Sequence, residues 1–153
     1  MPERGRALAA RLISNHAYVL RNTGPGTENA AFKDARAFEG HVVSAYQAAD
    51  MVAQQLGAAD IDPLVLAGYL LHHLATTQEA ENGNKRLAIC AASEALAQDG
   101  YRIDATSSHV AQFVIEVATG KKSVHQAIDW LAERVAPIHG SPPSYGDHLI
   151  LMT

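Results

Sequence analysis

The stretch Pro63-Leu64-Val65-Leu66-Ala67-Gly68-Tyr69-Leu70-Leu71-His72-His73-Leu74 decides the fold of this chain. Its apolar residues occupy nearly all sides of a helix instead of one face, which is typical of a helix surrounded by other elements. Asp62 precedes the stretch as a cap, and Pro63 takes the first helical position, where proline loses no hydrogen bond. We therefore predict a central helix that begins at Pro63.

The segments on either side of this stretch predict two more helices. Before it, apolar residues return at helical spacing from His41 to Leu56, and Gly57 ends the run. After it, a connecting loop is expected from Thr76 to Asn82. A further helix then begins at Asn84 and ends with Gly100 as its cap.

Two helices complete the predicted body of the domain. Ser107 or Ser108 can cap the first, which Gly120 closes. The run Ser123 to Gln126 fits a capping box and opens the second, with Trp130 as a packing anchor and Pro137 as the stop. Neither a repeat nor an alternating strand pattern stands out. We predict an all-α, compact helical domain built around the central helix.

The two ends of the chain are less regular. Leu8, Leu12 and Leu20 lie on one face of a predicted N-terminal helix. Residues 21–26 end that helix, and the segment from Thr27 to Gly40 is mixed, with Phe32 and Phe38 as anchors of a loop, a flap or a short hairpin. Residues 138–153 form a tail with an apolar end, expected to dock on the body or to meet a partner. Residues 1–153 are interpreted as a single domain.

Composition narrows the class of protein. The chain has 153 residues, of which 48% are hydrophobic, which is enough for one core. A net charge of -4 gives no pull toward nucleic acid or anionic lipid. No apolar run reaches the roughly 20 residues that span a bilayer, and the start of the chain does not resemble a signal peptide. With Cys90 as its single cysteine, the chain is expected to be soluble and cytoplasmic, and Cys90 to be a small packing residue.

Chemistry-bearing residues gather in Glu79-Ala80-Glu81-Asn82-Gly83-Asn84-Lys85-Arg86. This run lies at a helix start, where unpaired backbone N–H groups and the helix dipole favour anions. Gly83 allows close backbone approach, and Lys85 and Arg86 add positive charge at the same end. Phosphate is the expected ligand. A turn dipeptide followed by a solvated helix face is the alternative explanation of the same residues.

The residues Gly83-Asn84-Lys85-Arg86, and the segment Val117-Ala118-Thr119-Gly120-Lys121-Lys122-Ser123-Val124 near the end of the domain, carry a family resemblance. From about Val42 to Val135 the chain resembles Fic/Doc proteins, whose motif reads roughly His-x-Phe-x-Asp/Glu-Gly/Ala-Asn-Gly/Lys-Arg. Lys85, where many Fic proteins have glycine, makes the Doc branch the nearer relative.

This resemblance implies a function. In the family, the motif histidine acts as a base on a protein hydroxyl, the acidic residue holds a divalent metal, and the glycine, asparagine and arginine hold nucleotide phosphates. Fic proteins transfer a nucleotide monophosphate, commonly AMP, whereas Doc phosphorylates its target. The resemblance thus implies a nucleoside triphosphate as co-substrate and a protein target or an antitoxin-like partner.

The left half of the motif departs from the family. The histidine position falls on Gln78, the phenylalanine on Ala80 and the metal-binding acid on Asn82. An amide is not basic near neutral pH, so Gln78 positions a hydroxyl but does not take its proton. Loss of a general base costs about 10²- to 10⁴-fold in rate. Asn82 offers magnesium only a neutral oxygen, so metal binding is expected to be weak.

Other residues are candidates for the missing roles. His73 is a substitute base if the loop is rearranged, and Glu79 or Glu81 a substitute acid. Neighbouring positions on a helix point about 100° apart, so no joint metal site is expected from His72 and His73. The alternative for the two histidines is that one packs against the core and the other faces solvent.

One further motif suggests regulation. Many Fic proteins are restrained by a helix of pattern Ser/Thr-x-x-x-Glu-Gly/Asn, whose glutamate pairs with the motif arginine. The segment Ala35 to Gly40 resembles it, with alanine replacing the hydroxyl residue, and it suggests a pairing of Glu39 with Arg86.

Two functions remain open on these grounds. The first is a divergent or impaired transferase that moves a nucleotidyl or phosphoryl group to a protein hydroxyl, with phosphates held by Gly83, Asn84, Lys85 and Arg86. The second is a catalytically silent pseudoenzyme that acts as a binding or regulatory module. The sequence does not decide between them, because a fold can keep or lose its site.

Overall fold

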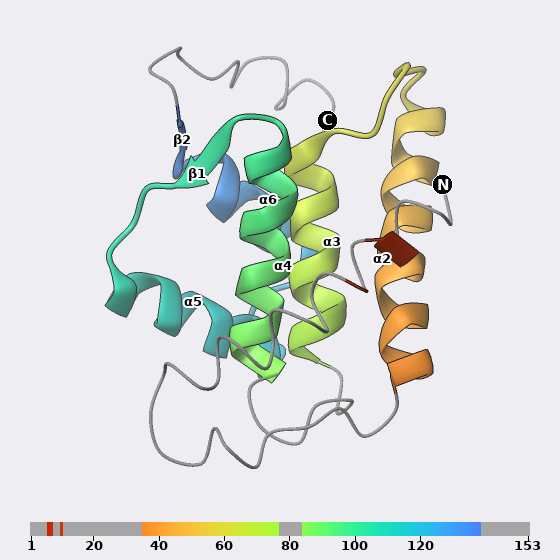
Figure 1. The fold of residues 1–153 in the computed structure, drawn as a ribbon. Coiled ribbons are helices and arrows are strands. Elements are labelled where there is room, and N and C mark those ends of the chain that lie inside the picture. Colours follow the sequence, from red (N-terminus) through yellow and green to blue (C-terminus); the bar gives the residue numbers. More distant parts are fainter. Residues whose placement is uncertain (1–5, 8–9, 11–34, 77–83, 139–153) are drawn as a thin grey trace.

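The computed structural model describes residues 6, 7, 10, 35–76 and 84–138. Within them the chain folds into helices with one short sheet (Figure 1). The elements, in chain order, are α2 (Ala35–Gln55), α3 (Pro63–Ala75), α4 (Asn84–Gln98), β1 (Tyr101–Ile103), α5 (Ser107–Ala118), α6 (Val124–Ala132) and β2 (Val135–Pro137). The all-α prediction is confirmed. The predicted N-terminal helix, Phe32 and the tail beyond Ile138 lie outside the described residues.

Helix α3 is the centre of the domain, as its composition predicts. Figure 1 shows it between α2 and α4, and it also packs against α5 and α6. Its start is set locally, because the Asp62 carboxylate accepts hydrogen bonds from the backbone N–H groups of Leu64 at 2.8 Å and Val65 at 3.3 Å. The side chains buried along it are Leu64, Val65, Leu66, Ala67, Leu70, Leu71, Leu74 and Ala75.

The helix before it is longer than the sequence predicts. Helix α2 begins at Ala35 instead of His41, so the hairpin prediction is wrong for residues 35–40, including Phe38. It ends as expected near Gly57, whose φ of 70° is a left-handed conformation that glycine adopts without strain. The glycines predicted to close α4 and α5, Gly100 and Gly120, also have positive φ.

Helix α5 has a different cap from the one predicted. Thr106, not Ser107 or Ser108, is the N-cap, and its hydroxyl oxygen accepts from the His109 backbone N–H at 3.3 Å. Thr106 has the extended backbone that a cap requires, whereas Ser107 is already the first helical residue. With three hydroxyl residues in succession, spacing alone does not identify the cap.

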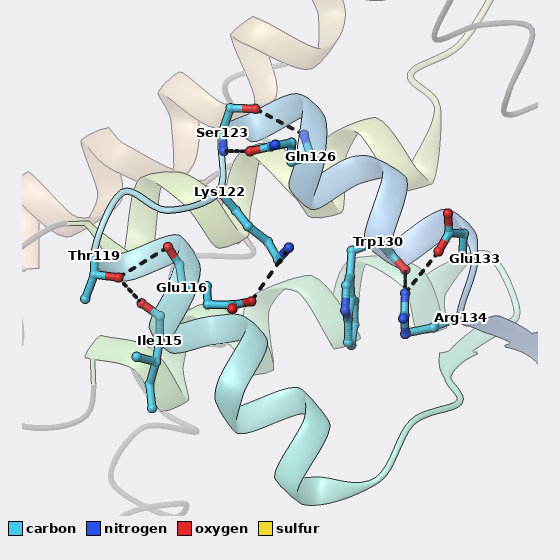
Figure 2. Close-up of polar contacts among 9 residues, drawn as sticks. All are labelled: Ile115, Glu116, Thr119, Lys122, Ser123, Gln126, Trp130, Glu133 and Arg134. Carbon is cyan, nitrogen blue, oxygen red and sulfur yellow. Dashed lines mark hydrogen bonds and ion pairs between the residues drawn. The ribbon is translucent and has the colours of Figure 1, made fainter.

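The turn from α5 into α6 is held by local polar contacts (Figure 2). The Ser123 hydroxyl accepts from the Gln126 backbone N–H at 3.2 Å, and the Gln126 side chain accepts from the Ser123 N–H at 2.8 Å, which confirms the capping box. Glu116 and Lys122 form an ion pair of 3.6 Å across the turn. These contacts fix the connection between α5 and α6.

A small sheet, which the sequence reasoning missed, closes the domain. β1 pairs antiparallel with β2, with Tyr101 opposite Pro137 and Ile103 opposite Val135. Helix α6 therefore ends at Ala132, and Pro137 lies in β2 instead of stopping the helix. Strands of three residues are too short to show an alternating pattern, so only the pairing reveals them.

Trp130 is a packing anchor, as predicted. Its ring stacks on that of Phe113 with 3.9 Å between centroids and 4° between planes. The Arg134 guanidinium lies 4.4 Å from the Trp130 centroid, and the same group donates to the Trp130 backbone carbonyl at 3.2 Å. The stack joins α5 to α6. Among the described residues, no helix is long and apolar enough to cross a bilayer.

Candidate functional site

The candidate site lies where α3 ends and α4 begins. The two helices run side by side in opposite directions, so the last turn of α3 and the first turn of α4 are at the same end of the domain (Figure 1). The structure thus brings His72 and His73 to the end where Lys85 and Arg86 lie. Gln78, Asn82 and Gly83 fall in the segment 77–83, outside the described residues, and so do Glu79 and Glu81.

The two cations occupy the places that the sequence predicts. Asn84 is the first residue of α4, and Lys85 and Arg86 follow in its first turn, both exposed. Positive side chains are unfavourable at this end of a helix unless an anion compensates them. An anion bound at the start of α4 would supply such compensation at Lys85.

Both cations line a pocket of about 380 Å³ between α4 and α5. Ile89 continues the wall along α4, and most of the rest of the wall comes from α5. The residues contributed by α5 and by the segment before it are Ala105, Ser107, Val110, Ala111, Val114 and Ile115. Sequence reasoning missed this pocket, because nothing in the order of residues indicates that α5 lies against the start of α4.

His73 is held by a hydrogen bond within its own helix. Its Nδ1 lies 2.9 Å from the Tyr69 backbone oxygen. A carbonyl only accepts, so in this contact Nδ1 carries the proton, and the basic nitrogen of the neutral ring is Nε2. His73 thus has the tautomer that a general base acting through Nε2 requires.

The pKa of His72 is changed by the surroundings of its side chain. Burial, and secondarily the neighbouring His73, lower the pKa of His72 below its ordinary value. The expectation that one histidine of the pair packs inside and the other faces solvent is wrong. Both side chains are half-buried, because the last turn of α3 lies at the rim of the core.

This lowered pKa predicts a pH dependence of stability. The folded state holds His72 neutral more strongly than the unfolded state does, so between about pH 6.5 and the lower folded pKa the unfolded chain binds more protons. The His72 contribution to stability is therefore present above about pH 6.5 and lost as the pH falls through that window. Urea titrations at several pH values check this, and the component should vanish in His72→Gln. An unchanged pH profile in that variant would contradict it.

Two other sequence candidates are placed by the structure. The Glu39 carboxylate, on α2, forms an ion pair of 3.1 Å with Arg6, while its suggested pairing with Arg86 stays a prediction. Cys90, on α4, is half-buried, and burial together with Glu94 raises the pKa of its thiol. A thiol that resists deprotonation is a poor nucleophile, so Cys90 fits the packing role expected of it.

The described residues do not form a recognisable metal site. No group of three or more His, Cys, Asp or Glu side chains with suitable geometry occurs within 35–76 and 84–138. The positions that the family resemblance assigns to metal binding, Asn82 above all, lie in the segment 77–83 outside the structural description.

Two comparisons with known proteins found no match for this chain. No protein-family model matches it, and neither does any curated protein. The Fic/Doc resemblance therefore remains a prediction that rests on the short motif and its flanking residues.

Proposed function

We propose that this protein binds a nucleoside triphosphate through its phosphates at the start of α4, as a Fic/Doc-like domain with impaired transfer of a nucleotidyl or phosphoryl group to a protein hydroxyl. One observation carries the proposal. Lys85 and Arg86 lie together in the first turn of α4, exposed and lining a pocket of a size suited to small ligands.

Electrostatics supports a ligand with negative charge. The helix start contributes the partial positive charge of its dipole, to which the two cations add. None of the described residues that line the pocket is acidic. An anion placed there meets attraction from the backbone and from both side chains.

The chemistry of the remaining residues supports slow transfer. Gln78 and Asn82 stand where the resembling family has its base and its metal-binding acid, and neither amide performs those roles. His73, whose Nδ1 lies 2.9 Å from the Tyr69 backbone oxygen, is the candidate for the missing base, with Nε2 as the accepting nitrogen. If His73 on α3 replaces the motif histidine as the base, metal binding stays weak, because Asn82 still lacks the carboxylate charge.

Removing the cations is expected to weaken nucleotide binding. Lys85→Gln with Arg86→Gln should lower the affinity for ATP by at least about 100-fold, because two charge-assisted hydrogen bonds, each worth about 1.5–3 kcal/mol, are lost. Calorimetric titration measures the affinity. The matched control is Arg102→Gln with Lys121→Gln, which removes two exposed charges elsewhere. Equal affinity in the two double variants would overturn the proposed phosphate site.

Restoring the motif should raise transfer. Gln78→His with Asn82→Asp returns the base and the carboxylate, and a base alone is worth about 10²- to 10⁴-fold. We expect label transfer from radioactive nucleotide to a lysate protein to rise at least about 100-fold over the parent. His73→Gln in the parent should abolish the residual transfer. Absence of transfer in parent and restored variant alike, with all four nucleoside triphosphates, would leave only the silent binding module.

A further inference from the structure

The wall of the pocket between α4 and α5 differs in character from its cationic edge. Figure 1 shows α5 crossing beside the first turns of α4, and the side chains that meet there are aliphatic. Val114 is buried, but Ile115 keeps 43% of its surface exposed although it lies next to a hydrophobic core. Large aliphatic surface at the lining of a pocket is stabilised when a ligand removes it from water.

Polar groups that read a ligand's hydrogen-bonding pattern are scarce in this wall. Apart from Lys85 and Arg86, Ser107 is the one lining residue within the described ranges whose side chain is able to donate or accept a hydrogen bond. Ligand sites obtain their specificity from a small number of precisely placed polar groups. This wall is suited to hydrocarbon instead of to the donor and acceptor edges of a nucleobase.

The geometry points to a second ligand class: an anion joined to a short alkyl chain, with its carboxylate or phosphate at Lys85 and its chain along Ile89, Val110 and Ile115. A volume of about 380 Å³ is near the lower end of small-molecule sites, so the pocket takes one such molecule. The inference goes beyond the proposed function, because it adds the aliphatic wall, which the proposed phosphate site does not use, to the same cations.

The inference predicts how strongly affinity depends on the length of the alkyl chain. Each methylene buried against the wall should raise affinity by about fourfold. Calorimetric titration with inorganic phosphate and with butyl, hexyl and octyl phosphate, each below its micelle concentration, measures this slope. Two added carbons should therefore tighten binding by about 16-fold. A series with equal affinities would overturn the inference.

Matched variants assign the slope to this pocket. Ile115→Gln should flatten the chain-length dependence and leave inorganic phosphate unaffected, whereas Lys85→Gln should weaken every member of the series. Met51→Gln is the control, because Met51 is 58% exposed on α2 and does not line the pocket. If affinity depends on alkyl-chain length as strongly in Ile115→Gln as in Met51→Gln, the alkyl chain binds elsewhere and the assignment to this pocket is overturned.

Two further arms separate the outcomes. An ATP titration that succeeds while the alkyl series shows no slope removes this inference and keeps the proposed function. If affinity rises with alkyl-chain length but ATP does not bind, the proposed function is overturned and this inference is kept. Sedimentation with vesicles containing phosphatidic acid tests the lipid source of the same chemistry. Binding to vesicles without a slope for monomeric alkyl phosphates would assign the cations to a membrane surface and overturn the inference.

Discussion

Replacement of Phe113 by alanine is expected to lower the free energy of unfolding by about 3–5 kcal/mol. Phe113 is only 1% exposed, and its ring stacks on Trp130 at 3.9 Å. The substitution removes a large apolar side chain from water-free surroundings and leaves a cavity that the packed helices fill incompletely. It also breaks the aromatic contact that joins α5 to α6, worth about 0.5–1.5 kcal/mol beyond burial.

Urea denaturation followed by circular dichroism measures this loss. Trp130 is the single tryptophan of the chain, so its fluorescence reports the same transition at the altered contact. The matched control is Ile115→Ala, two positions further along α5, where the side chain is 43% exposed and the loss should stay below about 1 kcal/mol. Equal losses in the two variants would contradict the packing of α5 described above.

Gly68→Ala is expected to destabilise the protein by about 1–3 kcal/mol although alanine is the better helix former. A Cβ at Gly68 would lie 2.3 Å from Cγ1 of Ile128, far inside contact distance. Ile128 is buried and its Cγ1 is near the backbone, so the side chain cannot move aside. Helices α3 and α6 must then separate, and the cost exceeds the gain of about 1 kcal/mol in helix propensity.

The comparison with Gly40 isolates the clash. Gly40 is exposed on α2, and a Cβ there meets nothing within 4 Å, so Gly40→Ala should stabilise by up to about 1 kcal/mol. The double variant Gly68→Ala with Ile128→Ala should be more stable than the sum of its single changes predicts, because Ile128→Ala removes the atoms that clash. Thermal and urea unfolding give the four free energies of this cycle. Stabilisation by Gly68→Ala alone would show that α6 packs differently.

Much of the fold follows from signals that act over a few residues. The cap at Asp62, the capping box at Ser123 and the glycine that ends α2 each involve contacts within one helical turn, so neighbours in sequence suffice to predict them. The central position of α3 follows from its apolar surface, which has to be buried on every side. The start of α2 was predicted wrongly because the residues before His41 have a mixed pattern, and the cap of α5 because Thr106, Ser107 and Ser108 all carry hydroxyl groups.

In the candidate site, too, the sequence determined some features and the tertiary structure others. The sequence by itself determined that Lys85 and Arg86 begin a helix, because Asn84 and the alanine-rich run after it favour that start. Only the tertiary structure decided that α5 lies beside this start and that aliphatic side chains face the cations across a pocket. It also decided the pairing of β1 with β2 and the stack of Phe113 on Trp130. These contacts join residues far apart along the chain, and burial of the shared core selects them.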